Sequence, residues 1–138
     1  MLHPIPPITG RRIRIALVGC GRISANHIKA IALHHERAEL VALCDTQSER
    51  LVAAQQLWAD AVSDQQGSMG QPTSFSSYPE LLGAVQAGQA AVDLVVLATP
   101  SGLHPAQVIA AAEAGLHVCT EKPMATRWAD GVAMVRAC

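Results

Sequence analysis

Residues 12–24 read RIRIALVGCGRIS, in which alternating polar and apolar residues give way to an apolar run that passes directly into a glycine-rich turn. This pattern is typical of a strand buried on both faces, as in a parallel sheet. Gly19 and Gly21 stand in a GxGxx pattern, and Ser24 takes the third position, where glycine or alanine is usual. The stretch therefore predicts a strand, a tight turn and a helix, with a small departure at Ser24 that bears on how closely helix and strand pack.

Apolar runs and helical patterns alternate along the rest of the chain. Further strands are predicted at 39–44, 93–98 and 116–120, and helices at 24–34, 104–114 and 126–138. Two Ser/Thr-x-x-Glu capping boxes, at 46–49 with Thr46 as N-cap and at 77–80, predict the starts of two more helices. This alternation indicates an α/β fold, a doubly wound parallel sheet with right-handed crossovers.

Two segments lie outside this pattern. Residues 1–10 hold three prolines and are interpreted as an extended leader, which leaves one domain over 11–138. Residues 63–74 are polar and glycine-rich, and we expect a surface loop there. The last helical pattern has no stop signal and its apolar stripe is still open at Val135. We therefore expect the first part of a longer protein, truncated in or after this helix.

Composition excludes several classes of protein. The chain has 138 residues, with 10 Lys+Arg against 11 Asp+Glu, and half of the residues are hydrophobic. These values exclude a disordered tail and a nucleic-acid binder that works by bulk positive charge. The sequence contains neither an apolar run long enough to span a membrane nor a secretory signal, so we expect a cytoplasmic protein.

The four cysteines lie far apart, without metal-ligand spacing, so neither a disulfide framework nor a metal site is expected. Cys20, Cys44 and Cys119 are interpreted as small buried hydrophobes near the carboxyl ends of the strands. Trp128, on the last helical pattern, is interpreted as a core residue.

The glycine turn and Asp45 form the sharpest functional pattern. The pyrophosphate of a dinucleotide must approach the backbone closely, so side chains must be absent at Gly19 and Gly21, and the following helix directs free N–H groups at the phosphates. Asp45 follows Ser24 by 21 residues at the end of a strand, where a carboxylate accepts ribose hydroxyls and repels a 2′-phosphate. The pair predicts NAD rather than NADP, although an ordinary glycine-rich turn and a strand-end aspartate stay open as alternatives.

Two more groups follow predicted strands, where open α/β sheets bind ligands. Thr99 and Ser101 offer hydroxyls, and His104 is either a member of the site or a solvated residue at a helix start. Lys122, between Glu121 and Pro123, could exchange a proton with a substrate hydroxyl if partial burial lowered its pKa. On residue type alone, a surface Lys-Pro turn is the better interpretation, and the Pro123 bond could be cis.

Together these motifs resemble the Gfo/Idh/MocA oxidoreductases, NAD(P)-dependent enzymes that act mostly on sugars. The matching segments are ALVGCGRISANHIKAI (16–31), LVALCD (40–45), LATPSGLHP (97–105) and TEKPMATRWADG (120–131). Within the family, the motifs look especially like those of the WlbA-type subgroup, whose members oxidise the 3-hydroxyl of UDP-N-acetyl-glucosaminuronic acid with NAD in lipopolysaccharide O-antigen synthesis.

The resemblance implies a Rossmann NAD-binding domain and a role for each matching residue. Gly19, Cys20, Gly21, Arg22 and Ile23 would line the pyrophosphate, and Asp45 would hold the adenosine ribose. The cofactor cleft would be lined by Thr99, Pro100, Ser101 and His104. Glu121 would contact the nicotinamide side, where Lys122 would be the catalytic lysine.

Family members continue into a second domain with a catalytic histidine, most substrate contacts and the oligomer interface. The resemblance therefore implies that these 138 residues bind NAD without being a competent dehydrogenase alone, and that the intact enzyme is a homo-oligomer acting on a nucleotide sugar. Two alternatives stay open: another sugar, inositol or diol dehydrogenase of the family, and a non-catalytic NAD-binding module that docks through its last helix.

Overall fold

Five strands form one parallel sheet, as the alternating pattern predicts. The computed structural model describes residues 6–65 and 69–138, so parts of the predicted leader and loop lie outside the described residues. The strands are β1 (Ile13–Val18), β2 (Ala38–Cys44), β3 (Thr73–Phe75), β4 (Leu94–Leu97) and β5 (His117–Thr120). Their order is β3-β2-β1-β4-β5, and all pairs are parallel. This is the doubly wound arrangement of a Rossmann fold, in which the strand order reverses beside β1.

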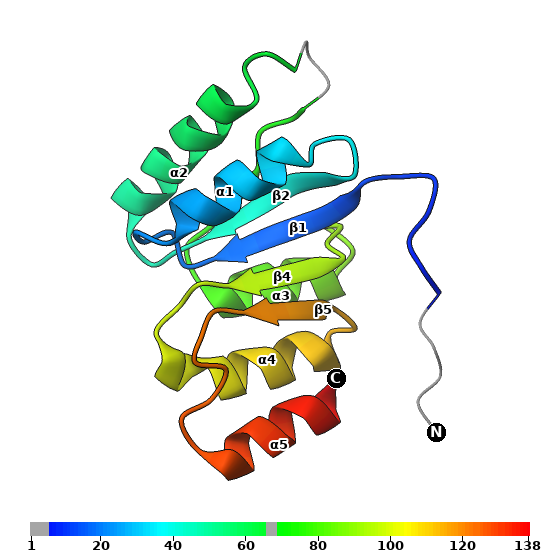
Figure 1. The fold of residues 1–138 in the computed structure, drawn as a ribbon, viewed down its shortest axis with the longest axis vertical. Coiled ribbons are helices and arrows are strands. Elements are labelled where there is room, and N and C mark those ends of the chain that lie inside the picture. The colour runs from blue at the N-terminus through cyan, green and yellow to red at the C-terminus, as the bar shows by residue number, and fades with distance from the viewer. Residues whose placement is uncertain (1–5, 66–68) are drawn as a thin grey trace.

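Helices cover both faces of the sheet (Figure 1). On one face lie α1 (Ser24–Leu33) and α2 (Ser48–Ala61), and on the other α3 (Tyr78–Gln86) and α4 (His104–Glu113). A fifth helix, α5 (Trp128–Ala137), packs beside α4 (Figure 1). The sheet is therefore enclosed near its centre and least covered at β5, its outer strand.

The core explains the apolar run over residues 15–18 of β1. Ile15 and Leu17 pack into the cluster with α1 and α2, and Ala16 and Val18 pack into the cluster with α3 and α4. Because alternate side chains point to opposite faces of a strand, a strand covered on both faces needs apolar residues at every position.

Two local predictions are wrong near the ends of β2 and α2. The loop predicted over 63–74 contains β3, a three-residue strand that pairs with β2 through Thr73, Ser74 and Phe75. The Thr46 cap does not form, because α2 begins at Ser48 and the carboxylate of Asp45 accepts the N–H of Gln47 at 2.8 Å. The N-cap residue is Gln47, and no side chain makes a cap hydrogen bond at the start of α2.

The second capping box is confirmed at Ser77, whereas the Glu80 carboxylate bonds to Ser76, one residue before the N-cap. The Ser77 hydroxyl accepts the N–H of Glu80 at 3.3 Å, at the start of α3. The Glu80 carboxylate accepts the N–H and the hydroxyl of Ser76 at 3.1 and 2.8 Å. The bond to Ser77 satisfies an N–H group that the start of a helix leaves without a partner, and the two bonds from Ser76 fix the chain just before the helix.

Burial predictions are wrong on the outermost elements. Trp128 is 88% exposed on the outer surface of α5 and is not a core residue. Cys119 is exposed on β5, whereas Cys20 and Cys44 are buried as predicted. Both errors arise on elements with a neighbour on one side, so an apolar sequence there does not imply burial.

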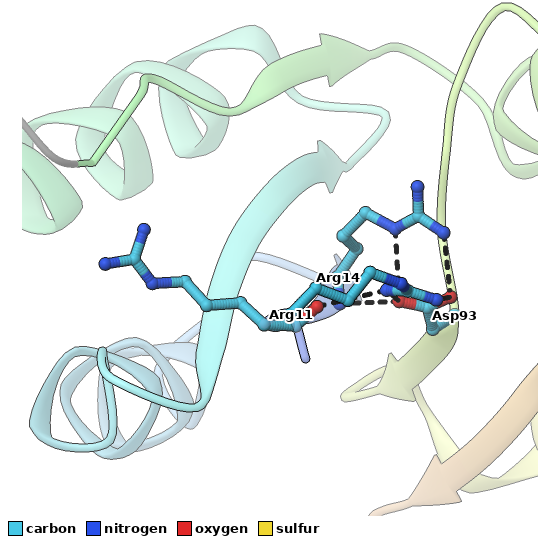
Figure 2. Close-up of polar contacts among 4 residues, drawn as sticks. Arg11, Arg14 and Asp93 are labelled. Atoms are coloured by element: carbon cyan, nitrogen blue, oxygen red, sulfur yellow. Dashed lines mark hydrogen bonds and ion pairs between the residues drawn. The ribbon is translucent and has the colours of Figure 1, made fainter. Parts of the chain in front are cut away.

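A charged cluster joins the amino ends of β1 and β4 (Figure 2). The Asp93 carboxylate, whose side chain is 10% exposed, accepts both ends of the Arg11 guanidinium at 2.6 and 2.9 Å. It also accepts the Arg14 side chain at 3.0 and 3.1 Å and the Arg14 backbone N–H at 2.8 Å. The hydrogen bonds from Arg11, followed by those from Arg14, hold the pKa of Asp93 well below its usual range. The cluster stabilises the fold at the end of the sheet opposite the predicted site.

Candidate functional site

The carboxyl ends of β1, β2 and β4 surround a cavity of about 310 Å³. Five of the predicted site residues line it: Gly19, Gly21, Asp45, Thr99 and Pro100. The remaining lining residues are Val18, Cys44, Thr46, Arg50, Tyr78, Ala98, Leu103 and Gln107. The cavity lies where the strand order reverses, the position at which open α/β sheets bind ligands.

The two glycines of the turn are required for different reasons. Gly19 has φ +91°, and a Cβ there would lie 2.6 Å from the carbonyl oxygen of Ala98, so the fold itself demands glycine. At Gly21 a Cβ would meet only the Nη1 atom of Arg50, at 3.9 Å. The space in front of Gly21 is therefore left open by the protein, as close approach of a pyrophosphate to the backbone requires.

Asp45 is held against the glycine turn. Its side chain is 7% exposed, and its Oδ2 atom accepts the N–H of Cys20 at 2.9 Å while Oδ1 accepts the N–H of Gln47. These bonds place a carboxylate at the end of β2, on the cavity wall. Each oxygen keeps a further lone pair, so the carboxylate can still accept hydroxyls of a ribose.

The start of α1 suits an anion. The helix has no side-chain cap hydrogen bond and no acidic residue in its first turn. Ser24 is buried, and its hydroxyl donates to the carbonyl oxygen of Gly21 at 2.5 Å, so serine closes the turn without disturbing it. Arg22 and Ile23 are exposed beside the turn and do not line the cavity.

The loop after β4 forms the opposite wall of the cavity. The hydroxyl of Thr99 donates to the Oε1 atom of Gln107 at 2.5 Å, and the hydroxyl of Tyr78 donates to the backbone carbonyl of Gln107 at 2.7 Å. Burial raises the pKa of Tyr78, which stays a neutral donor. Ser101 begins a 3₁₀ turn (Ser101–Leu103) and does not line the cavity.

His104 is fully buried, so the alternative of a solvated helix-start residue is wrong. Its two ring nitrogens lie 2.9 Å from the carbonyl oxygen of Thr99 and 3.0 Å from that of Pro123. The imidazole thus ties the loop after β4 to the loop after β5. In this structure it supports the walls of the site from behind and does not line the cavity.

Glu121 and Lys122 lie at the carboxyl end of β5, next to the start of α1. The Oε1 atom of Glu121 is 2.7 Å from the Nε2 atom of His27, a residue of α1, and this hydrogen bond is the main cause that lowers the pKa of Glu121. Lys122 is exposed, so the partial burial considered for it is not found in this chain. The Lys122-Pro123 bond is cis.

Sequence patterns did not point to several residues of the site. Among them are Thr46, Arg50, Tyr78, Leu103, Gln107 and His27. Spacing signals exist for two of them, because Gln107 comes one helical turn after His104 and His27 one turn after Ser24. For Tyr78 no local signal exists, since only the fold brings α3 beside the loop after β4.

Neither buried thiol is suited to act as a nucleophile. Burial raises the pKa of Cys20 to about 11 and that of Cys44 to about 12, so both stay protonated at neutral pH. Within residues 6–65 and 69–138, no group of three or more His, Cys, Asp or Glu side chains could hold a metal ion. No helix of this described part is both long and apolar enough to span a bilayer.

The match to a known protein family covers the strands and helices from β1 to α5. Residues 13–138 match the family described as an oxidoreductase family with an NAD-binding Rossmann fold (GFO_IDH_MocA). The crystal structure of the WlbA dehydrogenase from Bordetella pertussis, in complex with NADH and UDP-GlcNAcA, is 54% identical, with a TM-score of 0.78 over 96% of this chain and 34% of that chain. The WlbA dehydrogenase from Chromobacterium violaceum, with the same ligands, is 48% identical, with a TM-score of 0.79 over 99% of this chain and 34% of that chain.

A further relative is named for a different substrate. D-apiose dehydrogenase from Paraburkholderia graminis is 38% identical over 130 residues, which are 94% of this chain and 30% of that protein. The chain thus spans about a third of the length of the relatives it matches.

Proposed function

This chain belongs to the Gfo/Idh/MocA family of NAD-dependent oxidoreductases, and on that premise we propose that it is the NAD-binding domain of a sugar-nucleotide 3-dehydrogenase. The substrate resembles UDP-N-acetyl-glucosaminuronate, and the reaction belongs to lipopolysaccharide biosynthesis. The observation that carries the proposal is the identity of 54% and 48% to two WlbA dehydrogenases crystallised with NADH and UDP-GlcNAcA.

The site residues have distinct roles in this proposal. The open space at Gly21 and the uncapped start of α1 receive the pyrophosphate, and Asp45 accepts hydroxyls of the adenosine ribose. NAD, when bound, accepts the hydride. The proton of the reacting hydroxyl is handled by Lys122, exposed at the end of β5, together with a histidine from the second domain of family members. His27 holds Glu121 beside Lys122.

A second candidate is a dehydrogenase of a free sugar or polyol. The 38% identity to D-apiose dehydrogenase and the 31% identity to an inositol 2-dehydrogenase favour it. Both candidates share the nucleotide site and differ in the substrate. The leader at 1–10, the domain at 11–138, the homo-oligomer and the cytoplasmic location stay predictions.

Titration of this chain with NAD⁺ tests the nucleotide site. We expect saturable binding, weakened at least about tenfold by Asp45→Ala, because each hydrogen bond to a charged group contributes about 1.5–3 kcal/mol. Asp64→Ala, at an exposed aspartate, is the matched control and should leave the affinity unchanged. Absence of NAD⁺ binding by the wild-type chain would contradict the proposal.

The substrate is tested by measuring turnover. The enzyme for this assay contains this domain within a chain as long as those of its relatives. We expect NADH formation with UDP-N-acetyl-glucosaminuronate and little with D-apiose or myo-inositol. Lys122→Ala should lower kcat at least about a hundredfold, in the range of general acid–base catalysis. Preference for a free sugar would favour the second candidate, and an unchanged kcat would remove Lys122 from the reaction.

A further inference from the structure

His104 is a fully buried side chain whose two ring nitrogens both face backbone carbonyl oxygens. Its Nε2 atom lies 2.9 Å from the oxygen of Thr99, after β4, and its Nδ1 atom lies 3.0 Å from the oxygen of Pro123, after β5. The residue begins α4, behind the candidate site, and does not line the cavity. None of the roles proposed for the site residues involves this buried imidazole.

Both partners of the ring are acceptors, and this determines how many protons the ring must carry. A neutral imidazole has one N–H donor and one acceptor nitrogen, and only an imidazolium donates from both nitrogens. A neutral His104 would turn a lone pair towards one of the carbonyl oxygens, in a place that solvent does not reach. The positive end of α4 disfavours a cation, but its effect is smaller than that of two hydrogen bonds donated by a charged group. The geometry therefore favours an imidazolium that holds both loops.

The ring is held by backbone and not by a carboxylate. The charged residues of the surrounding elements are Glu121, Lys122 and Arg127 after β5, Glu113 at the far end of α4, and Asp130 and Arg136 on α5, whereas residues 98–103 have no charged side chain. Over the described residues, no carboxylate is a hydrogen-bond partner of the ring. What His104 fixes is therefore the course of the backbone at two points.

Lys122 lies between two residues that the protein holds in place. On one side, the N–H of Glu121 donates to the carbonyl oxygen of Leu97 at 2.9 Å. On the other side, the carbonyl oxygen of Pro123 accepts from His104. The exposed lysine therefore stands on a backbone that is anchored before and after it, and a fully buried side chain provides the second anchor.

We propose that His104 is a positioning residue for the reaction. As an imidazolium it joins the carbonyl of Thr99, in the cavity wall, to that of Pro123, and so sets where Lys122 stands beside the cavity. The proposal rests on the proposed function, because it takes Lys122 as a group that handles the substrate proton. His104 then acts on the rate only through Lys122.

The first test is turnover of the enzyme that contains this domain within a chain as long as those of its relatives. His104→Gln should lower kcat by about tenfold to a hundredfold, since a displacement of about 1 Å can cost that much, and should change the NAD⁺ dissociation constant by less than about threefold. Val108→Ala, at a buried apolar residue one turn further along α4, controls for lost stability and should leave kcat unchanged. Equal losses of kcat in both variants would overturn the inference.

A double variant separates positioning from an independent role. In the Lys122→Ala enzyme, His104→Gln should lower the residual kcat by less than about twofold, because no lysine is left to position. A loss as large as in the wild-type enzyme would overturn this inference and leave the proposed function standing. An unchanged kcat in Lys122→Ala alone would instead overturn the proposed role of Lys122, and the inference with it.

Nitrogen NMR of the 138-residue wild-type chain, labelled at histidine, examines the ring without any substitution. We expect one histidine with a proton on both ring nitrogens and slow exchange of these protons with water, because His104 is fully buried. His117, an exposed histidine of β5, is the internal reference for fast exchange. A single slowly exchanging proton on the buried ring would show that it holds only one of the two loops, which would overturn the inference.

Discussion

The sheet carries a mostly buried aspartate at each end of its strands, and the two are treated differently by the protein. At the amino end, Asp93 is 10% exposed and accepts five hydrogen bonds from Arg11 and Arg14. At the carboxyl end, Asp45 is 7% exposed, accepts two backbone N–H groups and has an arginine at 3.9 Å beside a cavity.

The difference separates a structural carboxylate from a carboxylate prepared for a ligand. Asp93 has its charge neutralised by arginines within hydrogen-bond distance, and Figure 2 draws these hydrogen bonds and ion pairs as dashed lines. Asp45 is oriented by the backbone but keeps acceptor capacity towards open space. Burial is similar at the two positions, so it is the completeness of the partners that distinguishes them.

The largest effect is expected from the turn that borders Asp45. Gly19→Ala should lower the free energy of unfolding by about 3 kcal/mol, since a Cβ there overlaps the Ala98 carbonyl and the positive φ is unfavourable for alanine. Urea unfolding measures this. Gly21→Ala is the matched variant: it should keep its stability within about 0.5 kcal/mol and lose NAD⁺ affinity. Equal destabilisation by both would show that Gly21 serves packing.

Exchange of Asp93 for asparagine tests the comparison directly. Asp93→Asn should lower the free energy of unfolding by about 2 kcal/mol, because the arginine pairs lose their charge partner, and should leave the NAD⁺ dissociation constant unchanged. Asp64→Asn, the same change at an exposed residue, controls for the loss of one charge. A weakened NAD⁺ affinity in Asp93→Asn would contradict the assignment of a purely structural role to Asp93.

Acid should remove the contribution of Asp93. Its pKa in the folded protein lies below that of an unfolded aspartate, about 3.9. The contribution is therefore complete above pH 4 and is lost as the pH falls towards the folded value, by up to about 1.4 kcal/mol per pH unit. Urea midpoints between pH 5 and pH 2 should fall more steeply for the wild type than for Asp93→Asn. Parallel curves would contradict the assignment.

The smallest effect is expected at Glu121, whose carboxylate has a single side-chain partner, His27. His27→Gln should return the pKa of Glu121 towards its ordinary value, as carbon NMR of the carboxyl group can measure, and weaken NAD⁺ by no more than about threefold. His117→Gln, at an exposed histidine of β5, is the control. An unchanged Glu121 pKa would show that the 2.7 Å contact does not persist in solution.

Most of the fold was predictable because it depends on local periodicity. The strands at β1, β2, β4 and β5 are apolar runs, and each appears within two residues of its predicted bounds. The exception, β3, has one apolar residue among Thr73, Ser74 and Phe75, so its pairing with β2 leaves no local signature. Residues 73–75 form a strand because they pair with β2 at the edge of the sheet.

The site was predictable where it depends on backbone geometry. Gly19, Gly21 and Asp45 meet as expected, because strand, turn and helix follow directly along the chain. Arg50 and Tyr78 were missed, since their contribution depends on side-chain directions and on helix placement. Exposure of Trp128 and Cys119 was missed for a related reason: an apolar side chain is buried only where another element covers it.

The two tryptophans turn this last point into an optical property. Trp58 is fully buried, with its indole N–H donating to the carbonyl oxygen of Gly70 at 3.0 Å, whereas Trp128 stands in solvent on α5. One fluorophore therefore reports the integrity of the core and the other the covering of the outer helix. Emission from a Trp128→Phe variant isolates the signal of the core, and emission from a Trp58→Phe variant isolates the signal of α5.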